Sequence, residues 1–444
     1  MTETDLTATA SELGRAIGAG NLDPVDLTEA MLDTIQAHPA SQEIYARVTP
    51  ERARSEAAAA RARAAEGTRR GPLDGVPISW KDLFDSAGTA TEGGTRMLKG
   101  RVPDRDARVL ANATDAGLIC LGKTHQTELA FSGLGVNPQT ATPPNALDAP
   151  RAPGGSSSGA AVSTKLGLAA AGIGSDTGGS VRVPSAWNDL VGFKTSVGSL
   201  PMDGVLPLCA RFDTIGPLCR SVEDAAGLYA VMGNTKPVDL TGATVAGMRL
   251  LVLTNSVLEP LNDAPQDAFE AACATLSGAG ATLDQASVPA LDEAMTLASL
   301  FTAEAYGTWG DQIEAHGDLM YPMIRQRFEL GLKVTGPQFV ANWIRLDALR
   351  LAFLSAMEGY DAVVLPTSPI LPPNTADLLG DEVYFMDRNL EALRNTRVGN
   401  LMDLTGVSLP TGTPHCGFMM LAPAGQEARV LRLAAAVEKT LRVR

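Results

Sequence analysis

The pattern of apolar and polar positions predicts helices at the start of the chain. One face of a helix is marked by the apolar side chains of Leu27, Met31, Leu32 and Ile35. Asp23 and Pro24 precede them and fit an N-cap followed by proline at the first helical position. Residues 51–66 are rich in strong helix formers. We therefore expect residues 1–65 to form a helical segment.

Helical and strand patterns alternate after this segment. Residues 76–80 predict a short strand that enters a loop, and residues 145–160 are rich in Pro, Gly and Ser, which favours a loop. The run at 160–174 is small and apolar and predicts a buried helix. The alternation extends to about residue 220 and predicts an α/β layered core.

The second half of the chain continues the mixed pattern. It predicts strands at 248–253 and 362–365, a helix at 265–277, and a mostly helical region at 296–360. We find neither a repeat of fixed period nor a clean linker, so the chain is expected to form one large domain over residues 1–444.

Composition narrows the class of protein. The chain has 444 residues, of which 45% are hydrophobic and 19% charged, so it is able to bury a large core. Its net charge of −14 argues against nucleic acid as a partner and against a polybasic membrane-binding surface. No apolar run reaches the length of a membrane span, and the polar, acidic start does not resemble a signal peptide. We expect a cytoplasmic protein.

Cysteine and histidine give no sign of a disulfide framework or a metal site. The four histidines show no metal-binding spacing, so we predict no metal and no cofactor. The five cysteines are scattered, which is typical of a reduced compartment. They are Cys120, Cys209, Cys219, Cys273 and Cys416.

Two segments combine glycine pairs with hydroxyl side chains. Residues 153–159 read Pro-Gly-Gly-Ser-Ser-Ser-Gly, and residues 174–184 contain Asp-Thr-Gly-Gly-Ser. Glycine lets the backbone approach a ligand closely, and consecutive N–H groups are then able to converge on an oxyanion. Flexible linkers have similar composition, but both segments adjoin apolar runs that should be buried, so a linker is the weaker interpretation.

Residues 155–159 also match G-x-S-x-G, the nucleophile elbow of α/β-hydrolases, with Ser157 as nucleophile. That elbow follows directly on a strand, whereas the residues before it here contain two prolines. The downstream histidines, His316 and His415, lie in no recognisable setting. The elbow interpretation is therefore disfavoured.

Together with Lys81, these segments resemble the amidase signature family. The resemblance covers most of the chain and includes residues 71–83, 122–130, 153–159, 174–194, 360–367 and 400–412. It implies an α/β fold with a large mixed β-sheet covered by helices on both faces. It divides the chain into the helical segment 1–65, a catalytic core at 66–220, and a remainder at 221–444 that completes the sheet and shapes the substrate pocket.

The resemblance also implies a catalytic triad. Ser180 matches the nucleophile, Ser156 the bridging serine after a cis peptide bond, and Lys81 the general base. Such chemistry requires a buried lysine, because only a neutral amine accepts a proton. The backbone N–H groups of Thr177, Gly178, Gly179 and Ser180 would form the oxyanion hole.

Weaker expectations concern the surrounding residues. Ser157 is expected to hydrogen-bond within the triad, and Asp176 and Arg182 to brace the loop. Four arginines of the 296–360 region are candidates for holding a substrate carboxylate, although a solvated helix surface is the favoured interpretation of each. They are Arg325, Arg327, Arg345 and Arg350.

The resemblance implies an amidase that hydrolyses a small carboxylic amide or carbamoyl compound through an acyl-enzyme, with a homodimer as the oligomeric state. Asn188 and residues 421–425 resemble small-substrate members such as allophanate hydrolase. Two alternatives use the same scaffold. One is the glutaminase component of glutamyl-tRNA(Gln) amidotransferase, which passes ammonia to a partner, and the other is a non-catalytic binding protein.

Overall fold

The computed structural model describes residues 6–441 and contains, in this range, one sheet of eleven strands. Its strand order is β1-β3-β2-β4-β6-β5-β10-β11-β9-β7-β8. The strands are β1 (Tyr45–Val48), β2 (Pro77–Lys81), β3 (Ile119–Thr124), β4 (Gly172–Asp176), β5 (Val191–Lys194), β6 (Thr214–Cys219), β7 (Arg249–Leu253), β8 (Thr282–Ala286), β9 (Ala362–Pro366), β10 (Leu404–Pro410) and β11 (Gly417–Pro423).

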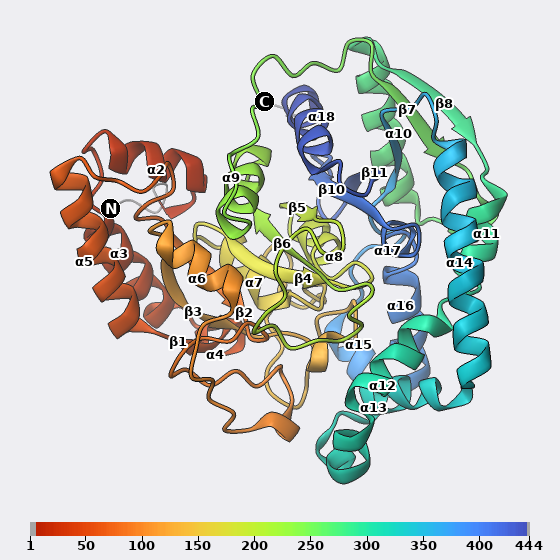
Figure 1. Cartoon of the computed structure of the whole chain (residues 1–444), viewed down its shortest axis with the longest axis horizontal. Coiled ribbons are helices and arrows are strands. Elements are labelled where there is room, and N and C mark those ends of the chain that lie inside the picture. The colour runs from red at the N-terminus through yellow and green to blue at the C-terminus, as the bar shows by residue number, and fades with distance from the viewer. Residues whose placement is uncertain (1–5, 442–444) are drawn as a thin grey trace.

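The sheet is mixed, as the family resemblance implies. Strand β2 runs parallel to both β3 and β4, and β7 runs parallel to β8 and β9. The strands between these two groups, from β4 across to β9, pair antiparallel. The central strands are fully buried, which is expected for a sheet that helices cover on both faces (Figure 1).

Helices lie on both faces of the sheet, and further helices lie beyond its two ends (Figure 1). The longer helices are α2 (Ala10–Gly18), α3 (Pro24–Ala37), α5 (Pro50–Glu66), α6 (Arg108–Asp115), α7 (Ser158–Lys165), α9 (Val222–Met232), α10 (Asp263–Gly278), α12 (Ser299–His316), α13 (Pro322–Glu329), α14 (Gly336–Ala356), α16 (Glu382–Ala392) and α18 (Glu427–Leu441). Shorter ones are α4 (Ser41–Ile44), α8 (Arg182–Trp187), α11 (Pro289–Met295), α15 (Thr375–Gly380) and α17 (Arg397–Leu401). Single 3-10 turns are η1 (Arg96–Leu98), η2 (Glu128–Ala130), η3 (Ser256–Leu258), η4 (Gly317–Leu319) and η5 (Leu330–Lys333).

Most of the predicted elements are confirmed, but the segment 1–65, predicted to be helical, also contains the strand β1, which pairs with β3. Helix α3 begins at Pro24 with Asp23 as its N-cap, and the strands predicted near residues 76, 248 and 362 are β2, β7 and β9. Helices α12, α13 and α14 occupy most of the region 296–360. Within residues 6–441, no helix combines the length and the apolar character that a membrane crossing needs.

The prediction of one buried helix over 160–174 is wrong in its second half. Helix α7 ends at Lys165, and Gly167 then adopts a left-handed conformation with φ of +73°. Residues 172–176 form the buried strand β4 between β2 and β6. A short run of small apolar residues fits a buried helix and a buried strand equally well, so its sequence pattern does not separate the two.

Candidate active site

Lys81 is the last residue of β2, and its side chain is fully buried. Because β2 and β4 are parallel neighbours, their carboxyl ends meet at the same edge of the sheet. Ser175, near the end of β4, accepts a hydrogen bond from Lys81 Nζ at 2.8 Å. Ser156, in the loop before α7, accepts a second from the same amine at 2.6 Å. The strand pairing therefore brings an amine and two hydroxyls together.

The electrostatic environment favours the neutral form of this amine. Burial lowers the pKa of Lys81 from 10.5 to about 7, although the carboxylates of Asp176 and Asp213 oppose the shift. Lys81 is therefore poised to gain or lose a proton near neutral pH, the property that a general base requires.

The serine-rich segment lies directly against the segment that carries Ser180. The peptide bond between Gly155 and Ser156 is cis, and the N–H of Ser157 donates to the carbonyl oxygen of Ser180 at 3.2 Å. The Ser157 hydroxyl donates to the Ser175 carbonyl at 3.3 Å. Among the described residues, no hydrogen bond joins the hydroxyls of Ser156 and Ser180.

In the loop 177–180, one of the N–H groups predicted for the oxyanion hole donates to a side chain instead. The N–H of Gly179, which the resemblance assigns to the oxyanion hole, donates to Asp176 Oδ1 at 2.8 Å. Asp176 closes this turn, and its carboxylate also accepts hydrogen bonds from Arg182 and Asn400. Gly179 itself is required here, since its φ is +138° and a Cβ would lie 2.1 Å from Thr396 Oγ1.

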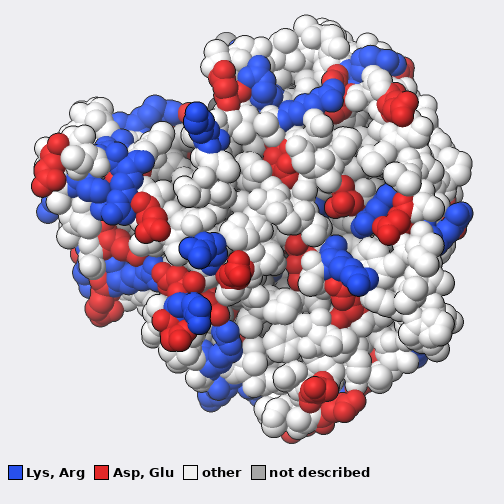
Figure 2. All heavy atoms as spheres, in the orientation of Figure 1, with Lys and Arg blue, Asp and Glu red and all other residues white. Residues whose placement is uncertain are grey.

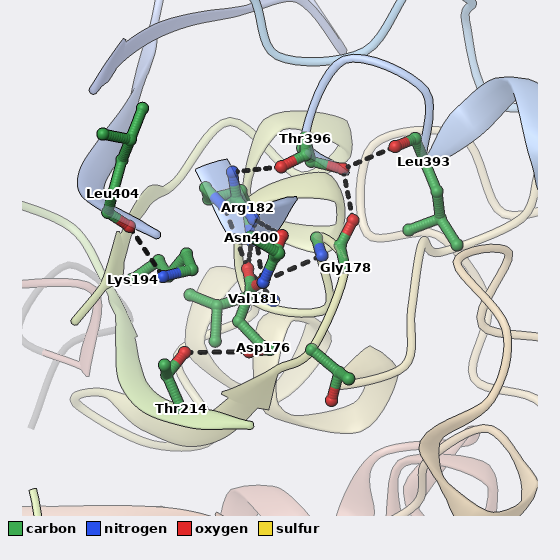
Figure 3. A network of polar contacts seen from close by, with 12 residues as sticks. Asp176, Gly178, Val181, Arg182, Lys194, Thr214, Leu393, Thr396, Asn400 and Leu404 are labelled. Carbon is green, nitrogen blue, oxygen red and sulfur yellow. Dashed lines mark hydrogen bonds and ion pairs between the residues drawn. The ribbon is translucent and has the colours of Figure 1, made fainter. Parts of the chain in front are cut away.

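Asp176 and Arg182 form a fully buried ion pair, with 2.8 Å between Arg182 Nη2 and Asp176 Oδ1 (Figure 3). Burial alone would raise the pKa of Asp176, but the Arg182 guanidinium and hydrogen bonds hold it below its ordinary value. Arg182 also donates to Asn400 Oδ1 at 2.6 Å and to the Thr396 carbonyl at 2.7 Å. The pair thus ties β4 to the segment 396–400.

A pocket opens beside this loop. Thr177, Gly178 and Ser180 line it on one side. Its other walls are mostly apolar, with Ser132 and two arginines among them. The remaining lining residues are Ala130, Phe131, Ser132, Leu208, Phe301, Arg327, Leu393 and Arg397.

A family model described as Amidase matches residues 26–431 of the chain. The chain belongs to the amidase family. This amidase is an enzyme that hydrolyses C–N bonds, in agreement with the activity that the sequence resemblance implies.

Two curated relatives and a solved structure are similar over nearly their full lengths. The 2-amino-5-chloromuconic acid deaminase of Comamonas testosteroni is 32% identical over 97% of this chain and 96% of its own. The A-type polypeptide of the glutamyl-tRNA(Gln) amidotransferase of Anaeromyxobacter dehalogenans (strain 2CP-C) is 30% identical over 97% and 95%. A crystal structure of an amidase superposes with a TM-score of 0.88 at 29% identity, covering 97% of this chain and 99% of that one.

Sequence reasoning missed several polar residues of the amidase site. Ser175 shares the Lys81 amine with Ser156, and Asp213 accepts a hydrogen bond from Thr177 Oγ1 at 2.5 Å. Thr396 Oγ1 donates to the Gly178 carbonyl at 2.7 Å (Figure 3). Ser175 adjoins Asp176 in the glycine-rich segment, which is a usable signal, whereas Thr396 is brought in by tertiary packing alone.

The four candidate arginines differ in their partners and in their exposure. Three of them have partners at or near the surface: Arg325 with Glu329, Arg345 with Glu293, and Arg350 with the Leu401 carbonyl and Asp347. Arg327 is only 7% exposed and lines the pocket, so the favoured interpretation of a solvated side chain is wrong for this residue.

Proposed function

We propose that this amidase hydrolyses a small carboxylic amide through an acyl-enzyme formed on Ser180. The observation that carries the proposal is the buried amine of Lys81, 2.6 Å from Ser156 Oγ and with a pKa of about 7. In its neutral form Lys81 accepts a proton from Ser156. Ser156 in turn accepts the proton of Ser180, whose Oγ forms a bond to the amide carbon.

The negative charge that develops on the carbonyl oxygen has to be stabilised by hydrogen-bond donors. The N–H groups of Thr177, Gly178 and Ser180 are proposed to provide them, without Gly179, because that N–H is bound to Asp176. When the C–N bond breaks, the proton returns from Lys81 through Ser156 to the leaving nitrogen. Water then attacks the acyl group by the same route and releases the acid and free Ser180.

The relay requires the Ser180 hydroxyl to turn toward Ser156 when substrate is bound. The two segments already lie against each other, because the Ser157 N–H donates to the Ser180 carbonyl.

Substitution of the nucleophile tests the proposal. Ser180→Ala is expected to abolish ammonia release from small amides while leaving the circular dichroism spectrum and melting temperature nearly unchanged. Ser158→Ala is a matched control, because this buried serine makes only a 3.4 Å contact with the His125 carbonyl. Substantial turnover by a clean Ser180→Ala preparation would refute the assignment.

A second candidate is a glutaminase that feeds ammonia to a partner, favoured by the 30% identity to an amidotransferase component. It predicts that glutamine is turned over in preference to other amides and that partner subunits co-purify with the chain. Turnover of other small amides by the isolated chain, with glutamine inert, supports the first candidate.

A further inference from the structure

Two arginines meet in the pocket that holds Ser180. Arg327 lies on α13 and Arg397 begins α17, and they are 7% and 9% exposed. Neither belongs to an ion pair within residues 6–441. The Nε and Nη1 atoms of Arg327 are buried without a hydrogen-bond partner. Burying a guanidinium without a partner costs free energy. We therefore expect the two arginines to bind an anion that comes from outside the protein.

The neighbours of Arg327 do not neutralise it. Its guanidinium lies 4.4 Å from the centre of the Phe131 ring. Burial, together with the like charge of Arg397, lowers the pKa of Arg327 to about 9. The Cys209 thiol also interacts with it, but burial raises the pKa of that thiol, so it remains uncharged. Both arginines remain protonated at neutral pH, since burial lowers the pKa of Arg397 only to about 10.

Other arginines of the described residues have a carboxylate partner. Arg182 is fully buried and has Asp176 as its partner. Arg325 lies two residues from Arg327 on the same helix and pairs with Glu329 at 2.7 Å. The lining of the pocket contains no carboxylate side chain to serve Arg327 and Arg397 in this way.

The charged side chains of Arg327 and Arg397 lie beside the loop that carries Ser180. Thr396, next to Arg397, donates to the Gly178 carbonyl, and a Cβ on Gly178 would lie 3.8 Å from Arg397 Cγ. Arg397 therefore adjoins the nucleophile loop. Leu208 and Phe301 contribute apolar walls to the pocket, and a charge interaction is stronger beside such walls than in bulk water.

We propose that the substrate of this amidase carries a carboxylate, which Arg327 and Arg397 bind while the amide carbonyl faces Ser180. A carboxylate matches the planar fork of a guanidinium. Because Ser180 and both arginines line one pocket, the amide and the carboxylate belong to one short molecule, such as the monoamide of a short dicarboxylic acid. This inference rests on the proposed function and adds the substrate class to it.

Paired substrates test the inference. Malonamate, succinamate and glutaramate are each compared with a neutral analogue in which a methyl ketone replaces the carboxylate, and ammonia release gives kcat/KM. We expect the wild-type enzyme to prefer at least one acid over its analogue by roughly 30-fold or more, the scale of a hydrogen bond to a charged group. In Arg327→Gln and Arg397→Gln this ratio should fall toward one. The control Arg325→Gln should keep it.

A binding measurement covers the case in which an arginine variant does not fold. Ser180→Ala protein is heated with glutarate or succinate, and with potassium chloride at equal ionic strength. The dicarboxylates should raise the melting temperature of the Ser180→Ala protein more than the salt does.

The outcomes separate this inference from the proposed function. Equal kcat/KM for acids and neutral analogues, with turnover that depends on Ser180, would overturn the carboxylate site alone. A preserved preference in both arginine variants, or no specific stabilisation by dicarboxylates, would also overturn it. Turnover that survives Ser180→Ala would instead overturn the proposed function.

Discussion

At the scale of single residues, the state of Lys81 decides what the site is able to do. Its amine is fully buried and touches two hydroxyls, and the opposing carboxylates of Asp176 and Asp213 do not keep its pKa at the ordinary value. A charged ammonium has no lone pair, so the proposed proton transfer from Ser156 to Lys81 requires that Lys81 has first lost its proton.

This state predicts the pH dependence of the reaction. Because the pKa of Lys81 is lowered to about 7, the neutral fraction rises with pH. We expect kcat/KM to increase about tenfold per pH unit below that pKa and to level off above it. Lys81→Met should remove most of the activity and the acid-side slope. An equally flat profile in both proteins would contradict the role of the base.

The residues of the site differ in how far the sequence predicts them. Lys81, Ser156 and Ser180 lie in motifs specific enough to be recognised, and the structure brings Lys81 and Ser156 into contact. Arg327 and Arg325 are equal candidates from the sequence, which does not distinguish two arginines of one short helix. Only the packing of α13 shows which of them faces the pocket.

At the scale of elements, the buried pair of Asp176 and Arg182 connects the end of β4, the start of α8 and helix α17 (Figure 3). Asp176 also holds the N–H of Gly179, so it shapes the turn that presents Ser180. The glycine-rich motif predicts such a turn, whereas its anchors at Thr396 and Asn400 come from more than 200 residues away.

Loss of the buried Asp176 charge should lower the free energy of unfolding much more than loss of a surface charge. Asp176→Asn leaves Arg182 buried without its counter-ion, and we expect the free energy of unfolding to fall by about 3–5 kcal/mol. The matched control is Asp284→Asn, which breaks the exposed pair with Arg249 and should cost about 1 kcal/mol or less. Urea denaturation measures both, and similar costs would contradict the anchoring role.

At the scale of the whole molecule, the mixed sheet gathers the site from distant parts of the sequence. The parallel strands β2 and β4 supply Lys81 and Ser175, while α13 and α17 supply the two pocket arginines. On the face drawn in Figure 2, acidic and basic side chains are interspersed and do not form one large basic patch. The alternation of elements predicts the α/β class, but strand order depends on tertiary pairing.

The proposal that Lys81 activates Ser180 as the nucleophile is tested most directly with a fluorophosphonate probe. Mass spectrometry locates the adduct of the probe, and its rate of formation is followed. We expect labelling on Ser180, with a rate that rises through about pH 7 and is largely lost in Lys81→Met. Labelling on Ser157, or labelling of Ser180 at the same rate in Lys81→Met, would contradict the proposal.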